Sequence, residues 1–257
     1  MNFFKNIYLF LSFRAIVIIF LAVVSTYLCR RYEFTADFPL SLIGTAIVFP
    51  IVFSISGAYK RRESALREYG VIKAHSRAIF FAARDWLEES DDQIQIEIKR
   101  LLSELLSACR ELFSVPVGQM NEKEKDVYRV FSKLSTYVKG FRKKGLSSGE
   151  VSRCNQFLSK IIIAFENIKH IYQYRTPRTL RTYSKVFICI LPILYGPYFA
   201  KISEEFAREL AYIMPVLFTL VLVSLDSIQD HLENPFDQIG EDDVRINAEK
   251  FVSRLDL

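Results

Sequence analysis

Side chains that could hold a hard cation are concentrated near the C-terminal end of the sequence. The segment 224–243 carries carboxylates on both sides of an Asn-Pro pair, with Asn234, Asp242 and Asp243 near a turn marked by Gly240. Carboxylate and amide oxygens are the ligands that cations such as Ca²⁺ prefer. The alternative is a solvated acidic tail, because residues 183–257 hold six basic and twelve acidic side chains, a net charge of −6. The charge pattern by itself favours the solvated tail.

A second group with a regular spacing lies in an apolar segment of the N-terminal quarter. Thr45, Phe49 and Phe53 recur every four residues, which places them on one face of a helix. The surrounding stretch, residues 39–59, contains no charged side chain. Spacing alone favours packing of this face against neighbouring helices in an ordinary membrane helix.

Residues for catalysis or for a transition-metal site show no matching pattern. The sequence has no GxSxG, Walker, HExxH or GxGxxG motif. His75, His170 and His231 are 95 and 61 residues apart, and the four cysteines form no CxxC pair. Basic residues are not interleaved with aromatic residues as in a nucleic-acid module. We therefore predict a non-enzymatic protein that does not bind nucleic acid and whose cysteines serve packing.

Four apolar runs predict the elements that position these residues: 7–29, 39–58, 186–200 and 210–225. A helix needs about 20 apolar residues to cross a bilayer, and the first two runs reach that length. The last two runs are shorter, so a buried core hairpin is the alternative for that pair. Arg14 interrupts the first run and is expected to snorkel to the interface or to pair within the helices. The predicted fold class is an all-α membrane protein with four transmembrane helices.

The middle of the chain is basic and amphipathic. Residues 59–182 hold 24 basic and 15 acidic side chains, a net charge of +9. The helix of the second run is expected to continue without a break to Glu89. Three further amphipathic helices are predicted to begin at the capping pairs Ser90–Gln93, Asn121–Glu124 and Ser147–Glu150. Together they predict a four-helix bundle, which the positive-inside rule places in the cytoplasm.

Two stretches resemble the bestrophin family of anion channels, including its bacterial and plant-type members. The first carries, in register and without gaps, Pro39, Leu42, Gly44, Phe53, Ala58-Tyr59, Arg61-Arg62, Ala65, Gly70 and Ser76-Arg77. The second is Glu233–Phe236 followed by Gly240–Asp243, similar to the acidic cluster that the family places after Asn-Pro-Phe-Gly. The order of the apolar runs and the helical middle are also similar to those of the family.

The resemblance implies a homopentameric, chloride-type anion channel around a central pore, with chloride as the permeant ion and no required cofactor. It implies that the second helix, 39–58, lines the pore. Thr45, Phe49 and Phe53 match the three positions of a narrow neck in the family. Thr45 differs from the aliphatic residue usual at the outermost position, which predicts a wider or wetter neck there.

Calcium-gated members of the family hold the ion in a clasp that follows the fourth helix. Asn234 and Asp242 match clasp positions, and Asp243 follows them. His231 stands where a Gln ligand is expected, and residues 237–239 interrupt the link between Pro-Phe and Gly. We therefore expect no calcium gating, as in bacterial-type members.

These inferences predict four segments. Residues 1–58 form the first transmembrane pair, 59–182 a cytoplasmic helical region, 183–226 the second transmembrane pair and 227–257 a cytoplasmic acidic tail. The expected protein is multi-pass, lies in a plasma or inner membrane, and contacts copies of itself, small anions and lipid. The alternative is a non-conducting, membrane-anchored helical scaffold for partner proteins, whose subunits need not surround an axis.

Overall fold

The computed structural model describes residues 13–37, 40–88, 92–174, 178–205, 210–233, 235–236 and 243–256, and these ranges contain helices and no strand. The elements are α2 (Phe13–Arg31), α3 (Leu40–Asp85), α4 (Asp92–Ser114), η1 (Val117–Gln119), α5 (Met120–Gly140), η2 (Phe141–Lys144), α6 (Ser148–Gln173), α7 (Arg178–Leu194), α8 (Gly196–Glu205), α9 (Leu210–Glu233) and α10 (Ala248–Val252). The all-α prediction is confirmed for the described residues.

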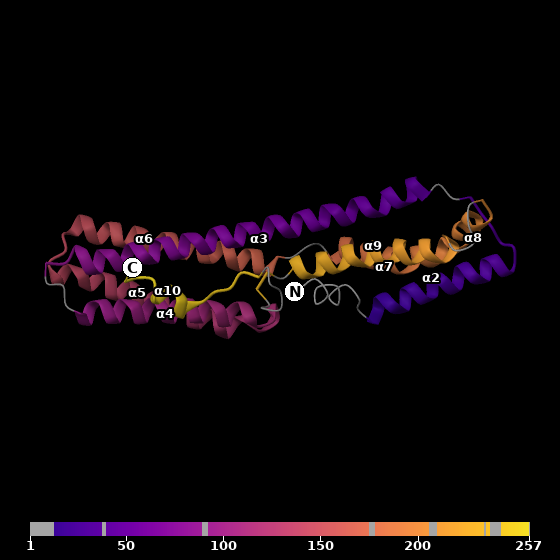
Figure 1. Ribbon diagram of the computed structural model, residues 1–257. Coiled ribbons are helices and arrows are strands. Elements are labelled where there is room, and N and C mark those ends of the chain that lie inside the picture. Colours follow the sequence, from indigo (N-terminus) through magenta and orange to yellow (C-terminus); the bar gives the residue numbers. More distant parts are fainter. Residues whose placement is uncertain are drawn as a thin grey trace. The chain divides into compact units, whose positions relative to one another are not determined.

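The helices form two compact units. The apolar unit comprises residues 1–59 and 176–233, and the bundle unit comprises residues 60–175 and 234–257. α3 contributes its first part to the apolar unit and its second part to the bundle unit, as the long indigo-to-purple helix of Figure 1.

α3 is one helix of 46 residues with Pro50 inside it. The predicted continuation of the second apolar run beyond Tyr59 is therefore confirmed, although the helix ends at Asp85 rather than at Glu89. Pro50 removes only one backbone hydrogen bond, and the residues on both sides of it keep helical geometry. The change from apolar to basic sequence at Tyr59 thus occurs within a continuous helix.

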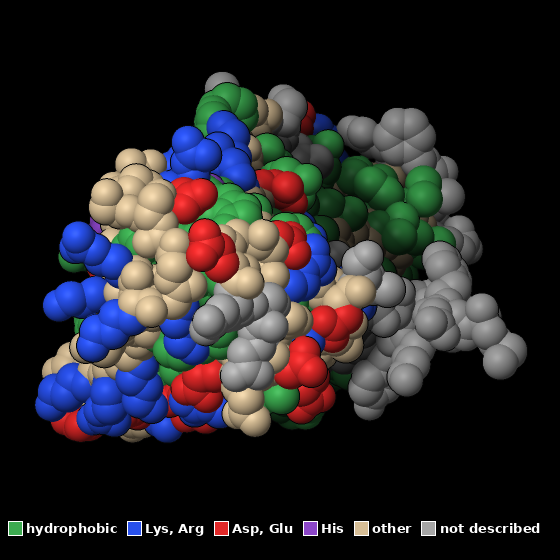
Figure 2. All heavy atoms as spheres, turned by 90° about the vertical axis from the view of Figure 1, so that its left-hand side faces the viewer, with side chains coloured by type: hydrophobic (Ala, Val, Ile, Leu, Met, Phe, Trp, Pro, Cys, Tyr) green, Lys and Arg blue, Asp and Glu red, His purple; other side chains and the backbone are tan. Residues whose placement is uncertain are grey.

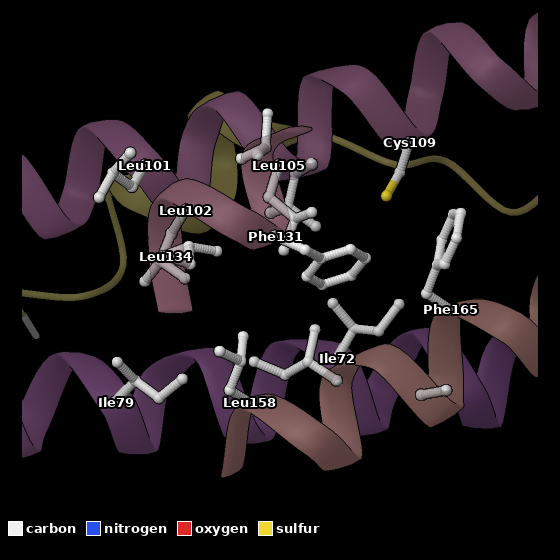
Figure 3. Close-up of a cluster of buried hydrophobic side chains, with 14 of the residues drawn as sticks. Ile72, Ile79, Leu101, Leu102, Leu105, Cys109, Phe131, Leu134, Leu158 and Phe165 are labelled. Carbon is white, nitrogen blue, oxygen red and sulfur yellow. The ribbon is translucent and has the colours of Figure 1, made fainter. Parts of the chain in front are cut away.

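The core of the bundle unit lies between α3, α4, α5 and α6. Ile79 of α3, Leu102 and Leu105 of α4, and Leu134 of α5 are fully buried. Figure 3 shows these side chains pointing toward one another, with Leu158 of α6 closing the cluster. Burying one such side chain contributes about 1.5–3 kcal/mol, so this core holds the four helices together.

Two helix starts in the bundle unit test the capping predictions. At α6, Ser147 accepts a hydrogen bond from the backbone of Glu150, and the Glu150 side chain accepts one from the backbone of Ser147, as predicted. The predicted start at Asn121 is wrong, because α5 already begins at Met120 with no side-chain cap at Gln119. Met120 is buried, and its burial anchors the first turn earlier than the polar pattern indicates. Ser90 lies outside the described residues, whereas its predicted partner Gln93 lies in the first turn of α4.

The apolar unit contains α2, α7, α8, α9 and the first part of α3, and α2 packs against α7, α8 and α9. The run 186–200, predicted as one segment, is instead divided between α7 and α8, which meet at Tyr195 with a bend of 42°. Pro192 before the break and Pro197 after it explain the division, because each lacks a backbone donor. The helix of the fourth run, α9, continues beyond the apolar residues and ends at Glu233, directly before the Asn-Pro pair that was expected to break it.

Among the described residues, α2, α3 and α9 are long and apolar enough to cross a membrane. α7 and α8 make a fourth candidate if the bent pair is one span.

Candidate pore-lining surface

The first part of α3 has one face that packs within its own unit. Ile47, Ile51 and Ala58 are 2%, 0% and 0% exposed. Ile47 and Ile51 belong to a cluster that also includes Ile188 of α7 and Leu222 of α9. This packing fixes which way the rest of the helix surface points.

The opposite face of this segment is apolar and open. Phe49 and Phe53 are 59% and 61% exposed, and Val52 beside them is 49% exposed. The two Phe rings meet edge to face, with centroids 4.7 Å apart and planes at 84°. Thr45 is also exposed, one turn before Phe49. The structure therefore places the three predicted residues together on one surface, which we call the phenylalanine strip (Thr45, Phe49 and Phe53).

The phenylalanine strip has a specific physical character. Phe rings cannot replace the hydration shell of an ion, and their edges carry partial positive charge. A ring of such side chains around a narrow pore excludes water when closed and favours anions over cations when hydrated. Within one chain the two Phe rings contact each other rather than the core of their unit, so packing inside the chain does not account for them.

The structure describes only one of the three residues of the predicted cation site. Asn234 and Asp242 lie outside the described residues, whereas Asp243 is described and half-buried. In the ranges that the structure describes, no three His, Cys, Asp or Glu side chains are grouped so that they could hold a metal ion. The clasp therefore stays a hypothesis.

Three carboxylates of the acidic segment face cations of the same chain. Ion pairs join Arg14 to Asp226 (Nη1–Oδ2, 2.9 Å), Lys185 to Asp230 (Nζ–Oδ2, 3.0 Å) and Arg181 to Glu233 (Nη2–Oε2, 3.0 Å). We call these six residues the polar seam; it ties α9 to α2 and α7. Asp226 and Glu233 are only 5% and 4% exposed, so their charges need these partners.

The sequence is compatible with Arg14 either snorkelling to the interface or pairing within the helices, and the structure shows that it pairs with Asp226. The other five residues of the polar seam were not predicted from the sequence. Their signal is helical spacing: Asp226, Asp230 and Glu233 are four and three residues apart on α9, and Arg181 and Lys185 are four apart on α7.

The cysteines of the bundle unit fit the predicted packing role. Burial raises the pKa of the Cys109 thiol to about 12, and burial together with Glu150 raises that of Cys154 to about 11. Both thiols therefore stay protonated at neutral pH and are poor nucleophiles.

Comparison with known proteins gives a likeness of fold. No protein-family model and no curated protein matches the sequence. Two crystal structures of a bacterial bestrophin homologue from Klebsiella pneumoniae, one of them a single-substitution variant, each have a TM-score of 0.76 to this chain at 16% identity, covering 95% of this chain and 96% of that one. A further variant of that homologue has a TM-score of 0.71 at 17% identity with the same coverage.

The chain therefore has the bestrophin fold. The resemblance to that family inferred from the sequence is confirmed for the fold. The fold and the apolar helices together indicate a membrane protein.

Proposed function

We propose that the chain is one subunit of a homopentameric, chloride-type anion channel whose five α3 helices surround a central pore. The observation that carries the proposal is the phenylalanine strip, which is exposed on α3 while the opposite face of the helix is packed. Exposed Phe also occurs on lipid-facing helices, so the bestrophin fold is what favours a pore over lipid for this face.

In the proposed channel, Thr45, Phe49 and Phe53 form the neck. Phe49 and Phe53 supply the apolar constriction, and the hydroxyl of Thr45 makes its outer end wetter. The neck restricts flow by dewetting, and permeating anions meet the positive ring edges. No cofactor takes part, and calcium gating is not included in the proposal.

The bundle unit would form a cytoplasmic vestibule that concentrates anions. Its sequence is strongly basic, with a net charge of +9 over residues 59–182. Figure 2 shows Lys and Arg side chains gathered mainly on the left of the visible face, while Asp and Glu side chains are spread over its middle and right. A surface of one predominant sign raises the local concentration of counter-ions, an effect that falls as salt rises.

The test is anion flux through the purified protein in liposomes. Native protein should pass chloride, and Phe49→Ala with Phe53→Ala should raise the flux severalfold, because removing the rings widens and wets the neck. Phe20→Ala is the matched control: Phe20 is 65% exposed on α2, which lies outside the proposed pore, and its loss should leave flux unchanged.

Absence of flux from a well-folded pentamer would refute the proposal and leave the membrane-anchored scaffold as the better description. Equal flux in the double variant and the native protein would show that the phenylalanine strip does not restrict the pore.

A further inference from the structure

A basic hollow lies on the surface of the bundle unit between α3 and α6. Its volume is about 360 Å³, and its lining includes Lys60, Arg61 and Arg67 of α3 and His170 of α6. Lys60 is the first charged residue after the uncharged stretch 39–59. The hollow thus begins where the chain changes from apolar to basic sequence.

One carboxylate, Glu68, also lines the hollow, but it is tied to the contact between the two helices. Its Oε2 accepts a hydrogen bond from Nδ2 of Asn167 on α6 (3.2 Å), and its Oε1 lies 3.6 Å from Nε of Arg67. The Glu68 side chain is 14% exposed, whereas that of Arg67 is 74% exposed. The accessible charge of the hollow is therefore positive, because Lys60 and Arg67 are exposed whereas Glu68 is partly buried.

We propose that this basic hollow (Lys60, Arg61, Arg67 and His170) binds a phosphate group. Guanidinium groups present forked donors that match the several oxygens of a tetrahedral anion, and an ammonium adds a point charge. Donors reach the hollow from two helices, which allows contacts on more than one side of the anion. A monatomic anion would use only part of this donor set.

Two sources supply a phosphate group: the headgroup of an anionic phospholipid and free phosphate. The position of Lys60 directly after an apolar stretch of membrane-spanning length brings a lipid headgroup within reach. The proposed site does not rest on ion conduction. Lys60 follows Phe53 by seven residues and so lies on the same face of α3 as the phenylalanine strip, so a lipid headgroup on this face would count against the pore, whereas free phosphate is compatible with it.

The experiment uses the full-length protein in a neutral detergent and measures bound lipid by native mass spectrometry, with phosphatidylglycerol and phosphatidylcholine as probes. Lys60→Gln with Arg67→Gln should weaken phosphatidylglycerol binding about tenfold or more, because two charge-assisted hydrogen bonds are lost. The matched control, Lys139→Gln with Arg153→Gln, removes the same charge from exposed positions outside the hollow and should bind as the native protein does.

Competition separates the two sources. If inorganic phosphate displaces phosphatidylglycerol and sodium chloride of equal ionic strength does not, the site binds a lipid headgroup. If the native protein binds phosphate but not phosphatidylglycerol, and the hollow variant loses the phosphate binding, the site binds free phosphate. Equal binding by the hollow variant, the control and the native protein overturns the proposal, as does displacement by chloride as effective as that by phosphate. Arg67→Gln alone is the second variant if the double variant does not fold, since its exposed side chain contributes little to packing.

Discussion

At the scale of single residues, the least expected feature is a charged pair in an apolar unit. Arg14 belongs to the first apolar run, yet its guanidinium reaches Asp226 Oδ2 and also Sγ of Cys189 (3.1 Å). The Asp226 side chain is 7% exposed and that of Arg14 is 40% exposed. Burial makes the carboxylate dependent on its partner, whereas the arginine retains contact with the surroundings.

Removing Arg14 should therefore cost more than removing the pair. Arg14→Met leaves a buried carboxylate without its cation and should destabilise the protein by about 2 kcal/mol, less than for a fully enclosed pair. Arg14→Met with Asp226→Leu should recover most of that loss. The measurement is the midpoint of thermal unfolding in detergent, and a double variant that is less stable than Arg14→Met would contradict the expectation.

His75 provides a second prediction at this scale. Burial lowers the pKa of His75, and the nearby Lys160 lowers it further, while the imidazole stacks on Phe157 with ring centroids 5.8 Å apart. The folded protein thus binds this proton less readily than the unfolded chain does. The contribution of His75 to stability should fall as the pH drops below the ordinary histidine value of about 6.5.

An NMR titration of the imidazole protons measures this directly. His75 should titrate below the ordinary histidine range, and Lys160→Gln should raise its pKa because a neighbouring positive charge is removed. A His75 pKa that is unchanged in the variant would show that Lys160 has no part in the shift.

At the scale of elements, the first residue of α8, directly after the break that follows α7, lies close against α2. Gly196 begins α8, and a Cβ at that position would overlap Oγ of Ser25 on α2 and lie 3.1 Å from the backbone carbon of Ser25. The Ser25 hydroxyl donates a hydrogen bond to the carbonyl oxygen of Ile193 (2.8 Å), so it cannot move without losing that bond. Small residues permit this kind of close approach between membrane helices.

Gly196→Ala should therefore destabilise the apolar unit by about 1–3 kcal/mol through overpacking. Gly70→Ala is the control, because Gly70 lies inside α3 with no atom within 4 Å of an added Cβ, and Ala there should stabilise the helix by up to about 1 kcal/mol. Thermal unfolding in detergent measures both; a Gly196→Ala protein as stable as the native one would rule out the close contact.

At the scale of the whole molecule, the proposed pore requires several copies of the chain. One α3 helix presents one phenylalanine strip, and a strip on a single helix encloses nothing. The proposed function therefore depends on assembly.

The purified protein should have five times the chain mass of 29.9 kDa, measured by light scattering corrected for detergent. Phe20→Ala should have the same mass as the native protein. A monomer or dimer would exclude a pore lined by one helix per subunit, whatever the flux measurement shows.

The sequence determined the features that depend on neighbours along the chain. The unbroken course of α3 follows from the absence of a strong breaker after Pro50, and the phenylalanine strip follows from a four-residue spacing that any helix turns into one face. The capping box at Ser147 was predicted correctly because its partners are three residues apart.

Only the tertiary structure decided the features that depend on distant partners. Arg14 and Asp226 are 212 residues apart, so no local pattern could choose pairing over snorkelling. The start of α5 at Met120 was set by the burial of that side chain against other helices. For the phenylalanine strip, spacing favoured packing, and the structure instead leaves Phe49 and Phe53 exposed, because Ile47 and Ile51 on the opposite face occupy the interior of the unit.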